Sequence, residues 1–154
     1  MRILLVDDSG SQRLLLTSLL RSGGYMDLVQ ADSAQAAFDR LGLDAGGDPA
    51  PVDLILMDIS MPDMDGIAAC RRIKAAAHLA DIPILMVTAS TEADDLERAF
   101  AAGALDFITK PLNKTELLAR VRSALRLKSE IDRRKAVERE LAELAGRWPA
   151  PAGS

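Results

Sequence analysis

The sequence Asp53-Leu54-Ile55-Leu56-Met57-Asp58 sets four apolar residues in a row between two carboxylates. A run of this length without a polar interruption is typical of a strand buried on both faces, as in a parallel sheet covered by helices on either side. Three more apolar runs also end at residues that can do chemistry. These are Ile3-Leu4-Leu5-Val6 before Asp7-Asp8, Ile84-Leu85-Met86-Val87 before Thr88, and Phe107-Ile108-Thr109 before Lys110-Pro111.

Segments with helical spacing of apolar residues separate these runs. Helices are predicted at about 12–20, 33–41, 67–74 and 93–102, and further strands at 28–31, 82–87 and 105–109. Ser9 or Ser11 can cap the first helix, and Ser33 can cap the second. Strands thus alternate with helices five times, which predicts an α/β fold with a doubly wound parallel sheet. Ligands of such sheets bind beyond the carboxyl ends of the strands.

If the four apolar runs are neighbours in that sheet, three carboxylates gather at one edge: Asp7, Asp8 and Asp58. Two like charges 4 Å apart repel by roughly 4 kcal/mol at an effective dielectric of 20, so either a raised carboxyl pKa or a bound cation is expected. Clustered hard oxygens select Mg²⁺, with Mn²⁺ as a substitute. A carboxylate oxygen could then attack a phosphoryl group and form an aspartyl phosphate. Thr88 and Lys110 could contact the phosphoryl oxygens.

In residues 1–127 the chain resembles the receiver domain of two-component response regulators. The resemblance is carried by a set of short motifs that together are far more specific than any one of them. In order, these are Asp7-Asp8, Asp53-Leu-Ile-Leu-Met-Asp58, Met61-Pro62-Asp63-Met64-Asp65-Gly66, Thr88-Ala89 and Lys110-Pro111. The fold that the resemblance implies is a flavodoxin-like five-stranded parallel sheet, to which this chain adds an extended C-terminal helix.

The resemblance also assigns roles to individual residues. Asp58 would be the phosphoacceptor, with Lys110 in contact with the phosphate and Thr88 paired with Phe107 as the switch residues. The metal would be bound directly by Asp8 and Asp58, and by Asp7 largely through water.

Three more expectations come from the same family pattern. The backbone carbonyl of Ser60 would be a further metal ligand, and the side chains of Ser60 and Ser90 would tune dephosphorylation. The peptide bond before Pro111 should be cis, since cis bonds are essentially a proline feature.

Composition limits the classes of partner. The net charge of −4 and pI near 5.0 give no basic field for nucleic acid or anionic membranes. The single cysteine excludes an internal disulfide and fits a reducing compartment, and no apolar run approaches the roughly 20 residues of a membrane span. We therefore expect a cytoplasmic protein that binds neither nucleic acid nor membrane.

The last part of the chain changes character. A helix from 113 to 145 would be about 50 Å long and would project from the receiver as a charged extension over 128–145. Its sparse apolar stripe predicts a homodimer through 113–145, although Arg134 and Glu138 would then lie in the seam of a coiled coil. Charged residues Asp106, Glu116 and Arg120 allow a second dimer mode on the receiver body. The tail at 146–154 is predicted to be disordered. The apolar stripe consists of Leu127, Ile131, Leu141 and Leu144.

The sequence therefore predicts a phosphorylation-dependent signalling switch rather than an enzyme acting on an external substrate. Its phosphodonor would be a histidine kinase or a phosphotransfer protein, and its output would pass through a protein-contact face and the final helix. Two alternatives stay open for the output: direct protein contact, or the regulatory half of a larger effector with a cyclase- or phosphatase-type domain. Two other classes of protein are considered. A phosphohydrolase with an Asp nucleophile usually carries a second Asp two residues later, where this chain has Ser60. A nucleotide- or flavin-binding module would have a glycine-rich phosphate-binding turn after the first strand, where this chain has only Gly10.

Overall fold

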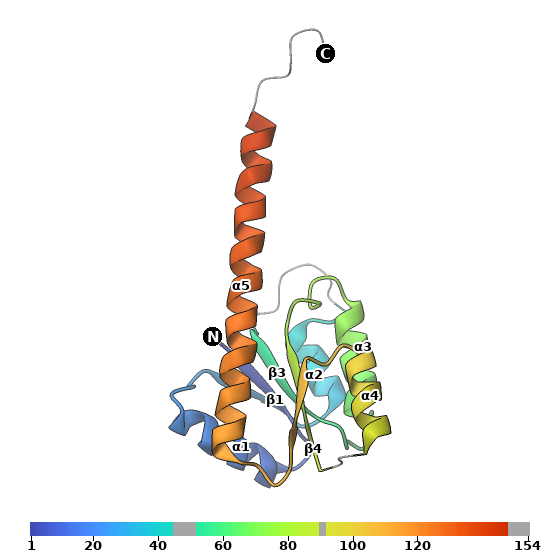
Figure 1. Cartoon of the computed structure of the whole chain (residues 1–154). Coiled ribbons are helices and arrows are strands. Elements are labelled where there is room, and N and C mark those ends of the chain that lie inside the picture. The colour runs from blue at the N-terminus through green and yellow to red at the C-terminus, as the bar shows by residue number, and fades with distance from the viewer. Residues whose placement is uncertain (45–51, 90–91, 148–154) are drawn as a thin grey trace.

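The computed structural model describes residues 1–44, 52–89 and 92–147. Five parallel strands form one sheet in the order β2-β1-β3-β4-β5, and a helix follows each strand (Figure 1). The strands are β1 (Ile3–Val6), β2 (Leu28–Ala31), β3 (Leu54–Asp58), β4 (Ile84–Thr88) and β5 (Asp106–Thr109). The helices are α1 (Gly10–Ser22), α2 (Ala34–Leu41), α3 (Gly66–Ala75), α4 (Ala93–Ala101) and α5 (Lys114–Arg147). The predicted doubly wound sheet with a long final helix is confirmed.

Two apolar layers hold the helices against the sheet. Because successive side chains of a strand point to opposite faces, Leu4 and Val6 pack with α2, α3 and α4, whereas Ile3 and Leu5 pack with α1 and α5. All four residues of β1 are buried, as are all five of β3 and of β4. This burial on both faces is the physical reason why the central strands appear in the sequence as unbroken apolar runs.

Helix caps explain where the first two helices begin. Ser9, and not Ser11, caps α1, since its hydroxyl accepts a hydrogen bond from the Gln12 N–H at 3.3 Å. Helix α1 therefore starts at Gly10, two residues before the predicted start. Ser33 caps α2 as predicted and accepts from the Ala36 N–H at 3.0 Å.

Strand bounds differ slightly from the prediction. Strand β4 begins at Ile84 rather than at residue 82, and it includes Thr88. Strand β5 begins at Asp106 rather than at residue 105. Helix α4 ends near Gly103 as predicted, and this glycine has a φ of +105°, a conformation that other residues rarely adopt.

Helix α5 has two halves with different surroundings. In the first half Leu117, Val121, Ala124 and Leu125 are buried against the sheet, but no residue from 128 to 147 is buried. We call residues 128–147 the stalk; it rises from the receiver body in Figure 1. The helix continues through Gly146 and Arg147, beyond the predicted end at residue 145, because a glycine exposed on a helix lowers stability but does not by itself end the helix.

Parts of two predicted segments lie outside the described residues: 45–51 of the loop before β3, and 148–154 of the tail. Among the helices that the structure describes, none has the length and apolar character needed to cross a bilayer. The expected cytoplasmic location stays a prediction.

Candidate functional site

Three carboxylates converge at the carboxyl end of the sheet. Strand β1 pairs with β3, and Val6 is opposite Met57. Asp7, the residue after β1, therefore lies beside Asp58, the last residue of β3. One oxygen of each of Asp7, Asp8 and Asp58 lies within 4.8 Å of the others. Asp7 and Asp58 are buried, with exposed fractions of 1% and 6%, whereas Asp8 is exposed. The pairing of β1 with β3 thus brings together the acids that the sequence separates by about 50 residues.

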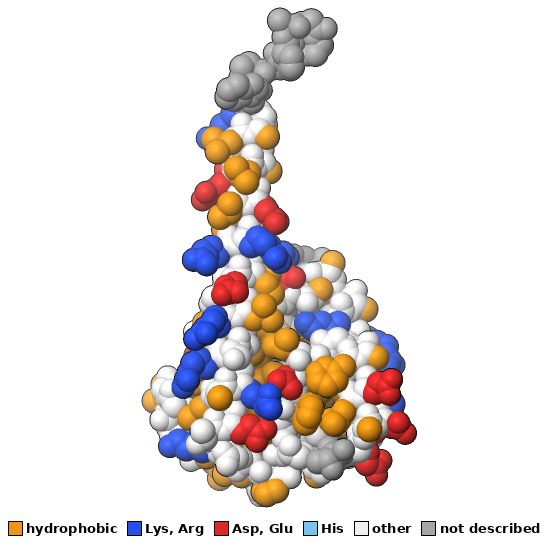
Figure 2. All heavy atoms as spheres, in the orientation of Figure 1, with side chains coloured by type: hydrophobic (Ala, Val, Ile, Leu, Met, Phe, Trp, Pro, Cys, Tyr) orange, Lys and Arg blue, Asp and Glu red, His pale blue; other side chains and the backbone are white. Residues whose placement is uncertain are grey.

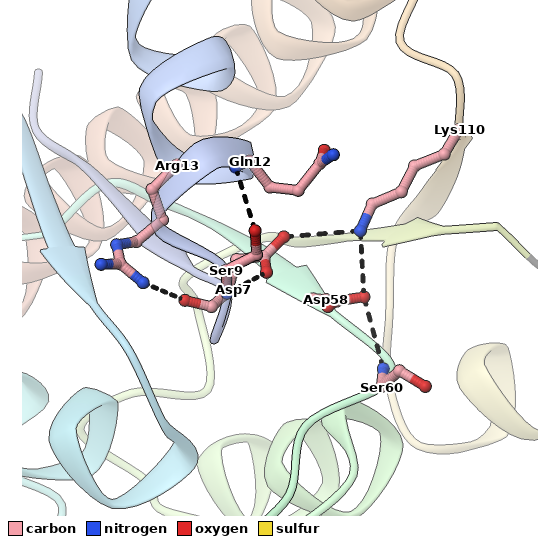
Figure 3. A network of polar contacts seen from close by, with 7 residues as sticks. All are labelled: Asp7, Ser9, Gln12, Arg13, Asp58, Ser60 and Lys110. Carbon is pink, nitrogen blue, oxygen red and sulfur yellow. Dashed lines mark hydrogen bonds and ion pairs between the residues drawn. The ribbon is translucent and has the colours of Figure 1, made fainter.

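Lys110 is the cation of this cluster among the described residues. Its Nζ lies 3.4 Å from Asp7 Oδ2 and 3.5 Å from Asp58 Oδ1 (Figure 3). The Lys110 N–H donates to the Thr88 carbonyl at 2.8 Å, which fixes the chain after β5, and the Lys110–Pro111 bond is cis as predicted. Three carboxylates and one lysine leave a formal charge of −2 at the site.

Hydrogen bonds from the backbone orient both buried acids. The Ser9 N–H donates to Asp7 Oδ1 at 2.9 Å, and the Ser60 N–H donates to Asp58 Oδ1 at 3.3 Å (Figure 3). Each acid therefore accepts from the residue two positions later, the local turn that Asp side chains favour after a strand.

Arg13 is a site residue that the sequence analysis missed. Its guanidinium donates to the Asp7 carbonyl at 2.6 Å (Figure 3), which ties α1 to the end of β1. It also donates to the Gln30 side chain of β2 at 3.1 Å. Its position one turn into the helix that follows the acidic pair was the only sequence signal for this contact.

The surroundings raise the pKa of Asp58 above its ordinary value of 3.8. Burial is the largest cause, and the negative charge of Asp7 adds to it. Lys110 and the Ser60 N–H act in the opposite direction but do not cancel the increase. In the absence of a cation, the ionised form of Asp58 is therefore disfavoured.

The turn after β3 depends on a glycine in close contact with the backbone. A Cβ at Gly66 would lie 2.1 Å from the Asp58 carbonyl oxygen, and the Gly66 N–H donates to the Ile59 carbonyl at 2.7 Å. The neighbouring Asp65 caps α3 by accepting from the Ala68 N–H at 2.7 Å. A side chain at position 66 would displace the carbonyl beside the carboxylate site.

Asp63, from the same acidic motif, points elsewhere. Its carboxylate accepts from the N–H groups of Ala34 and Gln35, at 3.3 and 3.1 Å, at the start of α2. Desolvation raises the pKa of Asp63, but these hydrogen bonds outweigh it and hold the pKa below its ordinary value. Its contact with α2 gives this residue a structural function.

The predicted switch residues lie on β4, which is the neighbour of β3, and on β5, which is the edge strand beyond it. Thr88 is 3% exposed at the end of β4, and Phe107 on β5 is partly buried. The Phe107 ring meets the Phe100 ring of α4 edge to face, with centroids 6.0 Å apart and planes at 72°. Phe100 is 46% exposed, so this aromatic pair joins the sheet edge to the molecular surface. Ser90 lies outside the described residues.

Cys70 and His78 lie outside the carboxylate site. The Cys70 thiol is buried beneath α4 and donates to the Ala102 carbonyl at 3.6 Å, and burial raises its pKa to about 11. His78 is held by its ring Nε2, which lies 3.0 Å from the Gly42 carbonyl oxygen. Neither side chain belongs to a group of potential metal ligands among the described residues.

The carboxylate cluster suits a small divalent cation. Its donors are hard oxygens at the end of rigid strands, and the residual charge of −2 equals the charge that Mg²⁺ would neutralise. Mg²⁺ usually takes one or two carboxylates and keeps several waters, which agrees with the exposure of Asp8.

Comparison with known proteins agrees with this geometry. Residues 3–122 match the family model of the response regulator receiver domain. The chain belongs to this family. It is therefore the receiver domain of a two-component signalling protein, and the resemblance on which the sequence analysis relied is confirmed.

Curated relatives include regulators from bacteria and plants. The chain is 41% identical over 125 residues to the DNA-binding response regulator MtrA of Mycobacterium tuberculosis H37Rv, which covers 81% of this chain and 50% of MtrA. It is 37% identical over 119 residues to the two-component response regulator ORR1 of Oryza sativa subsp. japonica, which covers 75% of this chain and 52% of ORR1. The chain thus spans about half the length of these relatives.

Solved structures show the same fold. The chemotaxis protein CheY4 of Vibrio cholerae superposes with a TM-score of 0.71 at 28% identity over 80% of this chain and 97% of CheY4. The signal receiver domain of a histidine kinase from Syntrophus aciditrophicus gives a TM-score of 0.70 at 35% identity, over 80% of this chain and 89% of that domain.

Proposed function

We propose that the chain is a phosphorylation-dependent switch that accepts a phosphoryl group on Asp58 from a phosphohistidine of a histidine kinase or phosphotransfer protein. The observation that carries this proposal is the position of Asp58: a buried carboxylate at the end of a central strand, with Asp7 and Asp8 beside it and Lys110 Nζ 3.5 Å away. An isolated structural acid would have no need of two further acids so close to it.

In the proposed reaction, an Asp58 carboxylate oxygen attacks phosphorus, the P–N bond to the donor imidazole breaks, and the imidazole leaves with the bond's electron pair. The Ser60 N–H holds Asp58 in orientation, and Lys110 lies where it can contact a phosphoryl oxygen. The Thr88 hydroxyl, on the neighbouring strand, would contact a second oxygen. Bound Mg²⁺, held by Asp8, Asp58, the Ser60 carbonyl and, through water, Asp7, would neutralise the charge that develops on the phosphoryl oxygens.

Phosphorylation adds up to about two negative charges next to Thr88. We infer that Thr88 then moves toward the phosphate and that Phe107 turns inward, which remodels the surface of α4, β5 and the first half of α5. The contact of Phe107 with the exposed Phe100 gives this change a direct route to the surface.

The rival reading as a phosphohydrolase lacks its acid. Enzymes with an Asp nucleophile usually carry a second Asp two residues later, and Ser60 occupies that position here. We therefore propose self-phosphorylation and slow loss of the phosphate, with no external substrate.

For the output, we propose protein contact through the α4–β5–α5 surface and the stalk, and a homodimer formed through residues 113–145. MtrA is named as a DNA-binding protein, but half of its length lies outside the match. These 154 residues, with their net charge of −4, favour no DNA contact of their own. A cyclase- or phosphatase-type effector that this receiver regulates stays the alternative.

The test of the proposal is phosphorylation by acetyl phosphate in the presence of Mg²⁺, followed by intact-mass measurement. We expect one added phosphoryl group on the wild-type chain, none on Asp58→Asn, and wild-type labelling of the matched variant Asp32→Asn, whose carboxylate is exposed on the other side of β1. The label should be lost in hydroxylamine, as an acyl phosphate is. Undiminished, acid-stable label on Asp58→Asn would contradict the assignment.

A further inference from the structure

We infer that the stalk pairs with the stalk of a second copy of this chain and that the two stalks run antiparallel. This inference rests on the homodimer proposed above and adds its orientation and register. It is carried by the arrangement of apolar and charged residues along one face of the stalk.

That face carries exposed apolar residues. Leu127 and Leu141 are 37% and 61% exposed and Ile131 is half-buried, and Val137 and Leu144, at 49% and 59% exposed, lie beside them; Figure 2 shows hydrophobic side chains along the stalk. A shallow groove on this face is lined by Leu127, Glu130, Ile131, Arg133, Arg134 and Val137.

The receiver body contacts a different face of the stalk. Lys128 lies 3.8 Å from Asp53, and Lys135 forms an ion pair with Asp81, so these two lysines mark the side of the helix that is turned to the sheet. The body therefore leaves Leu127, Val137, Leu141 and Leu144 free for a partner, whereas Glu138 borders the groove between the body and the stalk.

The face has the spacing of a coiled coil. Alternating steps of four and three residues keep a single line along a supercoiled helix. Along residues 127–145 this line is apolar at both ends and charged in the middle, and neither of its charged residues forms an ion pair with any of the described residues. The line consists of Leu127, Ile131, Arg134, Glu138, Leu141 and Ala145.

Orientation decides whether the charges in the seam attract or repel. In a parallel pair each residue faces its own copy, so that Arg134 meets the partner's Arg134 and Glu138 meets the partner's Glu138. In an antiparallel pair centred on residue 136, Arg134 meets the partner's Glu138, and the reverse pair forms on the other side of the twofold axis. Only the antiparallel pair places Arg134 and Glu138 of each copy opposite a residue of the other charge.

The apolar residues match in the same register. Ile131 meets the partner's Leu141, Leu127 meets the partner's Ala145, and Val137 lies next to the partner's Val137 beside the axis. Read in opposite directions, the two copies of this segment therefore place apolar residues against apolar residues and opposite charges against each other. A twofold interface between antiparallel helices requires this self-complementarity. One consequence is that the two carboxylate sites lie at opposite ends of the assembly.

Disulfide cross-linking of the full chain tests the orientation. An equimolar mixture of the variants Ile131→Cys and Leu141→Cys, mixed before mild oxidation, should give a cross-linked dimer. Leu141→Cys alone should not, because its two copies would be displaced by about 15 Å along the axis at 1.5 Å per residue, beyond the reach of a disulfide. Wild type, whose one cysteine is buried, is the control. A cross-link in Leu141→Cys alone, with the mixture giving only links between copies of the same variant by peptide mass, would show a parallel pair and overturn the inference.

A charge reversal tests the seam by a second route, with sedimentation equilibrium as the measurement. Arg134→Glu places two carboxylates together in each charged layer of the antiparallel pair and should weaken association by roughly tenfold or more. The double variant Arg134→Glu/Glu138→Arg should restore it, and Arg126→Glu, with the same charge change at an exposed residue that does not line the groove, should have a much smaller effect. Equal effects of Arg134→Glu and Arg126→Glu, or a monomer at all concentrations, would refute the pairing. Neither readout depends on phosphate acceptance by Asp58, so a failure here leaves the proposed switch to its own test.

Discussion

Both ends of the sheet carry buried or half-buried aspartates, but their charges are compensated in different ways. At the amino end, Asp53 accepts a hydrogen bond from the Arg2 N–H at 2.7 Å and lies 3.8 Å from Lys128, and Asp81 pairs with Lys135. Each of these two acids lies near a lysine of the stalk, although Lys128 also pairs with Asp132 at 2.7 Å. At the carboxyl end, Lys110 contacts Asp7 and Asp58, and Asp8 lies beside them. Acids of the same type thus stabilise the structure at one end and leave an excess of negative charge at the other.

The difference indicates which acidic cluster is suited to bind a cation. A carboxylate with its own cation is already satisfied, so it gains little from a ligand. The cluster of Asp7, Asp8 and Asp58 keeps a formal charge of −2, and its buried members cannot be solvated freely. It can therefore gain a large interaction energy from a divalent cation.

The largest effect that we expect from this contrast is stabilisation by magnesium. At a Mg²⁺ concentration of 100 times Kd, the free energy of unfolding of the wild-type chain should rise by about 2.7 kcal/mol. The measurement is urea unfolding with Mg²⁺ and with a chelator. Asp8→Asn should lose most of this gain, whereas Asp53→Asn, at the other end of the sheet, should keep it. Equal gains in the two variants would place the bound cation elsewhere.

The next effect is the stability of Asp58→Asn without metal. The pKa of Asp58 is higher in the folded chain than its ordinary value of 3.8. The protonated carboxyl therefore stabilises the fold fully below pH 3.8, and this stabilisation is lost as the pH rises through the raised pKa. Asparagine avoids this loss. At pH 7 in chelator the variant should therefore be more stable than wild type by on the order of 1 kcal/mol, since several kcal/mol of repulsion are partly offset by Lys110.

The pH dependence separates this cause from a packing effect. The advantage of Asp58→Asn should shrink toward zero as pH falls through the raised pKa of Asp58, in urea titrations at a series of pH values. The exposed control Asp32→Asn should differ little from wild type at any of them. An advantage of Asp58→Asn that is the same at acid and neutral pH would not come from the charge.

The smallest effect concerns the amino end. Lys135→Met removes the ion pair with Asp81, whose side chains are 53% and 38% exposed, and should cost at most about 0.5 kcal/mol at low salt. The cost should fall further in 1 M salt, where exposed charges are screened. The control is Arg133→Met, on another face of the same helix. A cost equal to that of the control would mean that this ion pair does not hold the stalk.

The sequence alone determined the order of elements, because strands buried on both faces must be apolar throughout and the segments between them keep helical spacing. It also predicted Asp7, Asp8, Asp58, Thr88 and Lys110 as candidate site residues, since each follows or ends such a strand. Boundaries were less accurate. Ser9 and Ser11 were equivalent as caps in the sequence, and only the backbone geometry selects Ser9.

Tertiary structure alone decided which side chains touch. The pairing of β1 with β3 brings Asp7 to Asp58, and the path of α1 brings Arg13 to the Asp7 carbonyl. The contacts of Lys128 and Lys135 with the amino end of the sheet were invisible in the sequence, because both residues look like part of a solvated charged helix. Such contacts join residues far apart in the chain, and no local pattern records them; they depend on the strand order and on the direction in which α5 leaves the sheet.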